Sequence, residues 1–237
     1  MERIYTGFES IDKSLQMDMG DLVVIGSRPA MGKTAFLISL LNNFSRNDIK
    51  CKFFSLELDE KNLSAKILKS TCNDKEREKA IFSNTAFNYE TFFTKGKFEA
   101  EIDKNVRVVL IDYLQLLDIN GLKSKEKIEI LKEIAVRKNV VIIIASQISR
   151  AFETYDFPPK ISAEMLLNKK ELLNNFAMES IDKFVFIDRP KRRLFCDIHA
   201  DDGADFVVLK NNNGNTFSVE CGLDNDTYTF KEITEKP

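Results

Sequence analysis

The chain of 237 residues predicts an α/β fold with a mainly parallel central sheet, flanking helices and an antiparallel β-hairpin extension at the C-terminal end. Three observations predict it. Apolar runs at 22–26, 106–112 and 140–147 are separated by helical sequence, as in βαβ crossovers that build a sheet covered on both faces. A tight loop ending in Gly-Lys-Thr, at 27–34, joins the first run to a helix. After residue 194, apolar and polar residues alternate as they do in antiparallel strands.

The composition excludes several classes of protein. Hydrophobic residues make up 43% and charged residues 30% of the chain, which is typical of a folded globular protein. The formal net charge is −2, so any contact with nucleic acid must come from a local basic patch. The four cysteines are scattered, which argues against a zinc site or disulfide framework and favours a reducing cytoplasm. Because no apolar stretch approaches the roughly 20 residues of a membrane span, we expect a cytoplasmic protein without a membrane partner.

The first element with chemical character is a phosphate loop. A short turn-and-helix lead-in at 4–12 precedes it, so we expect no domain between the start of this chain and the loop. The predicted loop consists of Ser27, Arg28, Pro29, Ala30, Met31, Gly32, Lys33 and Thr34. The motif usually begins with glycine, where this chain has Ser27.

Each part of such a loop has a chemical task. Backbone N–H groups at a helix N-terminus bind phosphates, the Lys33 ammonium reaches the outer phosphates, and the Thr34 hydroxyl ligates Mg²⁺. The alternative interpretation is that Gly-Lys-Thr opens an ordinary helix. The strand before it and the apolar helix face after it favour the phosphate loop, so we predict binding of a nucleoside triphosphate.

Two carboxylates follow predicted strands. The run at 52–58 carries Glu57 near its end, and the run at 106–112 closes on Asp112, while 59–104 between them are predicted to be helical. Glu57 either caps the next helix or belongs to a site, since chemistry in open α/β sheets is placed at the carboxyl ends of strands. Asp112 has the position that holds Mg²⁺ through water opposite a phosphate loop.

The second half of the chain adds the remaining strands. An amphipathic helix is predicted at 123–138, followed by the strand at 140–147 that ends in polar residues. Around Pro158-Pro159 the pattern breaks, and we expect a mobile loop over 151–181. A strand at 183–187 and a hairpin turn around Asn213-Gly214 complete the sheet. A solvated turn and a phosphate contact explain the basic cluster at 189–193 equally well.

Six segments together carry a family resemblance. They lie at 6–12, 20–22, 28–34, 54–57, 111–116 and 146–150. The most specific of them is the run Asp112-Tyr113-Leu114-Gln115-Leu116. In this order the segments resemble the C-terminal RecA-like ATPase domain of DnaB-type replicative helicases. The resemblance covers the chain from about Tyr5 to Arg150.

The resemblance implies a fold, cofactors and partners. It implies one RecA-like P-loop NTPase domain over residues 1–237 that uses ATP and Mg²⁺, works on single-stranded DNA as a homo-hexamer, and meets a primase or a helicase loader. The family's motor couples ATP hydrolysis to translocation on that strand and to duplex unwinding.

The resemblance also implies roles for individual residues. Lys33 and Thr34 would hold the β- and γ-phosphates and Mg²⁺, and Asp112 would organise the metal. Glu57 matches the general base, and Gln147 matches the residue that senses the γ-phosphate. Lys210 matches the lysine of a C-terminal hairpin that serves the neighbouring subunit's nucleotide.

Departures from the family pattern leave a second interpretation open. Asn212 stands where the family has an arginine finger, whose loss costs roughly three to five decades in rate in related sites. Leu172 and its neighbours replace a charged DNA-binding run, and the N-terminal collar domain and most of the linker helix are absent from this chain, so hexamer assembly stays open. The alternative is a divergent nucleotide-binding regulatory or loader-type module with weak or no helicase activity. A recombinase- or clock-type relative is a third interpretation, which the run at 112–116 disfavours.

Overall fold

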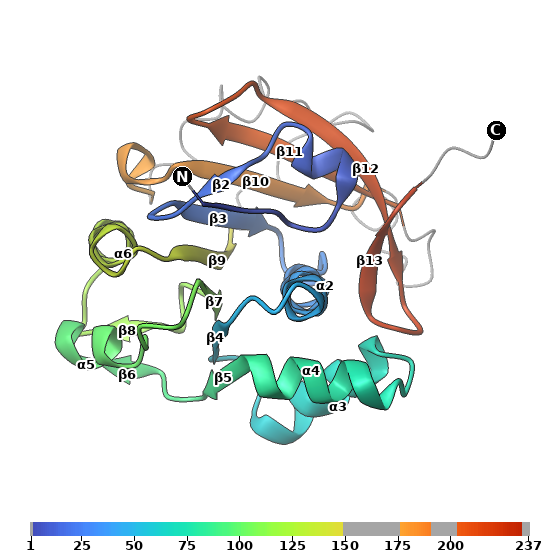
Figure 1. Cartoon of the computed structure of the whole chain (residues 1–237). Helices are drawn as coiled ribbons and strands as arrows, with labels where there is room; N and C mark the ends of the chain where they lie inside the picture. The colour runs from blue at the N-terminus through green and yellow to red at the C-terminus, as the bar shows by residue number, and fades with distance from the viewer. Residues whose placement is uncertain (1, 149–175, 191–202, 234–237) are drawn as a thin grey trace.

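A nine-stranded sheet forms the centre of the computed structural model, which describes residues 2–148, 176–190 and 203–233 (Figure 1). Its strand order is β13-β12-β11-β10-β3-β9-β7-β4-β5. The strands are β3 (Leu22–Ser27), β4 (Cys51–Ser55), β5 (Thr85–Asn88), β7 (Val108–Asp112), β9 (Val141–Gln147), β10 (Lys183–Asp188), β11 (Gly203–Asn211), β12 (Phe217–Asp224) and β13 (Thr229–Glu232). From β10 to β5 neighbouring strands run parallel, and from β10 to β13 they run antiparallel.

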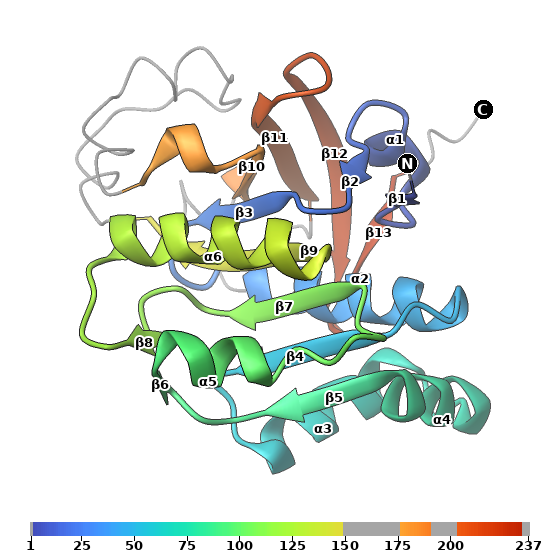
Figure 2. The same ribbon diagram turned by 60° about the vertical axis from the view of Figure 1, so that its left-hand side comes forward.

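Helices cover both faces of the sheet. On one face lie α2 (Lys33–Arg46), α3 (Glu60–Ser70) and α4 (Lys75–Asn84), and on the other lie α5 (Lys95–Ala100) and α6 (Ser124–Lys138) (Figures 1 and 2). Alternate residues of one strand supply the two cores: in β3, Leu22 and Val24 pack with α6, and Val23 and Ile25 pack with α2. Because the central strands are buried on both faces, their sequences are continuously apolar, which made them recognisable.

Short elements complete the description. The lead-in consists of β1 (Arg3–Ile4), α1 (Glu9–Asp12) and β2 (Met17–Asp18), with β1 and β2 paired antiparallel. A two-stranded parallel sheet joins β6 (Phe92–Phe93) to β8 (Asp118–Ile119), and a 3-10 turn, η2 (Met178–Ser180), precedes β10. In the part of the chain that the structure describes, no helix is long and apolar enough to span a membrane.

The structure confirms most of the predicted elements and corrects two. The prediction that 59–104 are helical is wrong at 85–88, where β5 pairs in parallel with β4 and forms an edge of the sheet, and at 92–93, where β6 pairs with β8. The strand predicted at 52–58 ends at Ser55, so Glu57 lies in the loop beyond it. The hairpin is confirmed, since β11 and β12 pair antiparallel around the turn that contains Gly214. Most of the loop predicted at 151–181 lies outside the described residues.

Candidate functional site

The carboxyl ends of β3, β4, β7, β9 and β10 meet at one edge of the sheet, because these strands run parallel. A cavity of about 290 Å³ opens there. Its lining residues are Pro29, Ala30, Gly32, Lys33, Thr34, Glu57, Tyr113, Gln147, Arg189, Leu223, Asn225 and Tyr228. The structure thus brings five of the eight predicted loop residues together with Glu57 and Gln147, whereas Ser27, Arg28 and Met31 do not line the cavity. Groups from the far end of the chain complete the lining.

The side chain of Lys33 is hydrogen-bonded to the loop between β3 and α2. Ser27 is the last residue of β3, and Lys33 is the first residue of α2. The Lys33 Nζ donates hydrogen bonds to Ser27 Oγ at 3.1 Å and to the Arg28 carbonyl oxygen at 3.2 Å. Burial lowers the pKa of Lys33, and the charges of Asp112 and Glu57 oppose that effect. Serine at the first motif position therefore supplies a hydroxyl that positions the lysine.

Gly32 is required at the start of α2 for two reasons. Its φ is +100°, a left-handed conformation that a side chain disfavours. A Cβ at this position would also lie 2.9 Å from Phe230 Cζ. The first N–H groups of a helix have no partner within the helix, and Gly32, Lys33 and Thr34 all line the cavity. The helix start thus offers a positive dipole end and unpaired donors to an anion. Met31, by contrast, is turned into the protein and is 4% exposed.

Asp112 and Thr34 form a pair suited to a hard cation. Thr34 Oγ1 donates to Asp112 Oδ2 at 2.7 Å, and Asp112 is 2% exposed. Burial raises the pKa of Asp112 to about 6, against the hydrogen bond from Thr34, with the charge of Glu57 adding to the rise. Asp112 Oδ1 is buried and accepts no hydrogen bond from any residue that the structure describes. A hydroxyl and an unsatisfied carboxylate oxygen fit Mg²⁺, which keeps several waters and takes few protein ligands alongside substrate phosphates.

No cluster of three or more His, Cys, Asp or Glu side chains suited to a metal occurs within 2–148, 176–190 and 203–233. The described side chains therefore offer a metal only a partial set of ligands at Asp112 and Thr34. Such a partial set is typical of a cation that is bound jointly with a phosphate ligand.

Gln147 is fixed by the run at 112–116. It pairs with Ser27 in the β3–β9 register, so it stands beside the phosphate loop. The Gln115 side chain donates to Ser146 Oγ at 3.1 Å and to the Gln147 carbonyl oxygen at 2.8 Å, and it accepts from the Gln147 N–H at 3.1 Å. The run that was most specific in the sequence thus joins Asp112, the predicted metal ligand, to Gln147, the predicted γ-phosphate sensor, through Gln115. Glu57 is exposed in the loop after β4 and lines the same cavity.

Several lining residues were not predicted. Leu223, Asn225 and Tyr228 come from the turn between β12 and β13 and the strand end before it, which close one side of the cavity. Lys66 Nζ lies 3.6 Å from the centroid of the Tyr228 ring. Tyr113, next to the predicted Asp112, also lines the cavity, and burial raises its pKa.

Arg189 is the one member of the basic cluster that the structure places at the site. It directly follows β10, is 2% exposed and lines the cavity. This position favours the phosphate-contact interpretation for Arg189. The remaining basic members of the cluster, at 191–193, lie outside the described residues.

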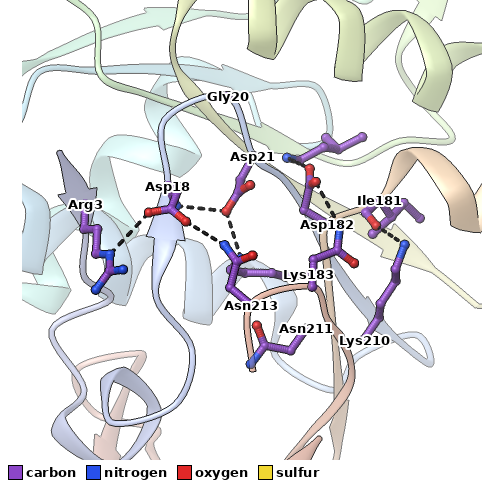
Figure 3. A network of polar contacts seen from close by, with 12 residues as sticks. Arg3, Asp18, Gly20, Asp21, Ile181, Asp182, Lys183, Lys210, Asn211 and Asn213 are labelled. Carbon is purple, nitrogen blue, oxygen red and sulfur yellow. Dashed lines mark hydrogen bonds and ion pairs between the residues drawn. The ribbon is translucent and has the colours of Figure 1, made fainter. Parts of the chain in front are cut away.

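Lys210 does not line the cavity of its own chain, and its side chain lies beside Ile181 (Figure 3). Its Nζ donates to the carbonyl oxygens of Met178 at 2.6 Å and Ile181 at 2.5 Å. In the β10–β11 register it pairs with Phe184, five positions before Arg189, which corresponds to about 17 Å along a strand. Asn212 is also held within the chain, by donating to Asp182 Oδ1 at 3.2 Å. A role for Lys210 at a nucleotide thus requires a second subunit and stays a prediction.

Fold and site together define the class of protein: a RecA-like P-loop nucleotide-binding domain. A solved structure of a DnaB-like replicative helicase, described with its interactions with primase, superposes with a TM-score of 0.78 at 20% identity, covering 98% of this chain and 62% of that one. The family model "DnaB-like helicase C terminal domain" matches residues 3–83 and 73–232. The chain therefore belongs to the DnaB-like helicase C-terminal domain family.

Relatives by sequence are longer proteins. A probable replicative DNA helicase of Guillardia theta is 28% identical, with 73% of this chain covering 32% of that protein. The replicative DNA helicase DnaB of Mycoplasma pneumoniae is also 28% identical, with 90% of this chain covering 53% of it. The chain thus spans between a third and about half of the length of these relatives.

Proposed function

We propose that the chain is the ATP-binding and ATP-hydrolysing motor domain of a DnaB-like replicative DNA helicase, which couples hydrolysis to translocation on single-stranded DNA and duplex unwinding. The observation that carries the proposal is the convergence of Lys33, Thr34, Glu57 and Gln147 on one cavity, with Asp112 hydrogen-bonded to Thr34 behind it. Membership of the DnaB-like family supports the choice of a helicase among P-loop proteins. Residues 1–237 would form one ATPase domain.

Each group of the cavity would have a separate role in phosphoryl transfer. Lys33 and the N–H groups at the start of α2 would bind phosphate oxygens. Thr34 and Asp112 would hold Mg²⁺, which supplies neutralisation of charge on the phosphates. The carboxylate of Glu57 would orient the attacking water and accept its proton. Gln147 would contact the outer phosphate, and its hydrogen bonds with Gln115 would keep it in place. Positioning and charge neutralisation supply most of the catalysis in this reaction class.

The proposed partners are single-stranded DNA, further copies of the chain in a hexameric ring, and a primase or helicase loader. In such a ring Lys210 would approach the nucleotide of a neighbouring subunit. The alternative is a DnaB-like nucleotide-binding regulatory or loader-type module with weak or no helicase activity. The observation that favours it is that Asn212 occupies the expected arginine position and is bound to Asp182 of its own chain.

ATP hydrolysis by the purified chain, measured with and without a single-stranded oligonucleotide, tests the proposal. A motor predicts hydrolysis that the oligonucleotide stimulates and that is lost in Lys33→Ala and Glu57→Gln. Glu60→Gln is the matched control, because Glu60 is an exposed carboxylate at the start of α3. Nucleotide binding without stimulated hydrolysis would instead support the regulatory module.

A further inference from the structure

A second cavity lies on the α2 face of the sheet, away from the phosphate loop. Its volume is about 320 Å³, at the lower end of the range for small-molecule sites. Its walls come from the lead-in, α2, the end of α3, the start of α4 and β13, and it shares no lining residue with the first cavity. The proposed function gives this cavity no role.

Two arginines line this cavity. Arg46 is in the last turn of α2 and Arg77 is in the first turn of α4. Burial lowers the pKa of Arg46, the charge of Arg77 lowers it further, and Asp74 acts in the opposite direction. Neither guanidinium forms an ion pair with a carboxylate of residues 2–148, 176–190 or 203–233. Two neighbouring guanidinium groups repel each other unless an anion lies between them.

The Arg77 guanidinium has N–H donors that are available to a ligand. Its Nε is buried and has no hydrogen-bond partner among the described residues. One terminal nitrogen, Nη2, donates to Asn42 Oδ1 at the long distance of 3.4 Å. A guanidinium carries five N–H donors in a planar fork that matches two oxygens of a phosphate. A buried donor without a partner costs free energy, which a bound anion would recover.

The remaining charged groups of the cavity already have partners. Lys231 is paired with Asp224 at 2.5 Å. The carboxylate of Glu232 accepts hydrogen bonds from the N–H of Ser10 at 2.6 Å and from its hydroxyl at 2.5 Å. These contacts leave Arg46 and Arg77 as the cations available to a ligand.

One wall of the cavity, formed by α2 and the end of α3, is polar. Asn42 is 5% exposed and donates to the Ile38 carbonyl oxygen at 3.0 Å and to Ser70 Oγ at 2.8 Å. Ser70, which is 4% exposed, completes this hydrogen-bonded floor. A polar wall beside two arginines suits a compact anion better than an apolar ligand, although Phe8 and Phe230 also line the cavity.

We propose that this cavity is a second anion site, which binds the phosphate group of a small molecule through Arg46 and Arg77. The ligand is either inorganic phosphate or pyrophosphate, or a phosphate ester such as a nucleotide; the chemistry recognised is the same. The proposal stands on this cavity alone and does not depend on the proposed motor function.

Calorimetric titration of pyrophosphate tests the proposal. The protein is the full chain carrying Lys33→Ala, in buffer without Mg²⁺, so that the phosphate loop contributes little. We expect saturable binding of one pyrophosphate per chain, weakened roughly 10-fold or more by Arg77→Ala or Arg46→Ala, as expected for loss of a charged hydrogen bond. Lys79→Ala is the matched control: Lys79 is an exposed cation of α4 that does not line the cavity, and its loss should leave the affinity unchanged.

Further titrations distinguish the possible sources of the phosphate group, and some of their outcomes would overturn the proposal. Phosphate and ADP, titrated in the same way, show whether the ligand is inorganic or an ester. Absence of saturable binding, or equal weakening by Lys79→Ala, overturns the site. Arginine-dependent binding of a short oligonucleotide without binding of pyrophosphate also overturns it, in favour of a nucleic-acid surface. Arg77→Lys keeps the charge and the fold, so this variant should bind pyrophosphate more tightly than Arg77→Ala does. Arg46 is exposed, so its substitution should leave folding intact.

Discussion

The stability of the ligand-free Asp112→Asn variant, relative to that of the wild type, should be greater at neutral pH than in acid, although the substitution removes the carboxylate of the proposed metal site. The ordinary pKa of an aspartate is 3.8, and burial raises that of Asp112 to about 6. Between these two values the folded state binds more protons than the unfolded chain. Stability contributed by this group is therefore present below pH 3.8 and is lost as the pH rises through 6.

The size of the effect follows from the shift. Because the pKa of Asp112 rises from 3.8 to about 6 on folding, the ionised side chain destabilises the folded protein by about 3 kcal/mol at pH 8. About half of that, roughly 1.4 kcal/mol, develops between about pH 5 and pH 8. In Asp112→Asn an NH₂ group replaces the unsatisfied oxygen Oδ1, and a buried N–H donor left without a partner costs about 1–3 kcal/mol. That cost is the same at both values of pH, so it cancels from the comparison.

Urea unfolding of the wild type and of Asp112→Asn at pH 5 and pH 8, without Mg²⁺ or nucleotide, measures the effect. The stability of the variant relative to the wild type should increase by about 1.4 kcal/mol from pH 5 to pH 8. Asp103→Asn, at an exposed carboxylate, is the control and should show no such change. A difference between Asp112→Asn and the wild type that is constant with pH, or that shrinks toward pH 8, would refute the reasoning. Mg²⁺ with ADP should raise the unfolding midpoint of the wild type but not that of the variant.

Three further substitutions test other parts of the molecule. Gly32→Ala should cost at least about 1–2 kcal/mol of stability, because of the left-handed backbone and the contact with Phe230, and should weaken nucleotide binding in a fluorescence titration. Lys183→Met should cost about 3–5 kcal/mol in urea unfolding, since Lys183 is 0% exposed and its Nζ lies 2.8 Å from Asp21 Oδ2. Gln115→Leu should lower kcat for ATP hydrolysis roughly 10-fold or more while the nucleotide Kd stays within about twofold, because it releases the predicted γ-phosphate sensor from its place.

Controls for these substitutions come from the same chain. Gly96→Ala places a Cβ with no heavy atom within 4 Å, in the helix α5, and should be neutral or stabilising. A cost below about 1 kcal/mol for Lys183→Met would contradict the description of a buried ion pair. Combining Gln115→Leu with Gln147→Ala should lower kcat no further than either change alone, and additive losses would show that the two glutamines act separately.

The sequence predicted the sheet best where strands are buried on both faces. In β3, β7 and β9, helices cover both sides, so the strands are continuously apolar and easily recognised. β5 was missed because it is a four-residue edge strand with an exposed Ala86, and it directly follows a helix. Its pairing with β4 decides its conformation, and a short segment carries no periodic signal of that pairing.

The same distinction holds at the site. Lys33 and Thr34 were predicted because the loop motif that carries them follows a strand that local sequence identifies, and Asp112 was predicted because it is the last residue of such a strand. Tyr228 was missed, since it reaches the cavity through the turn between β12 and β13 and no local pattern places that turn beside the phosphate loop. Arg189 was ambiguous in a basic cluster until the structure placed it, 2% exposed, at the end of β10.

The central claim is that the cavity at the carboxyl edge of the sheet binds a magnesium–nucleotide complex. Calorimetric titration of a non-hydrolysable ATP analogue tests it most directly. We predict that one analogue binds per chain and that its affinity for the wild type depends on Mg²⁺. Asp112→Asn should remove this dependence on Mg²⁺, and Lys33→Ala should abolish binding. Binding that is unchanged in Lys33→Ala, or that is indifferent to Mg²⁺ in the wild type, would contradict the claim.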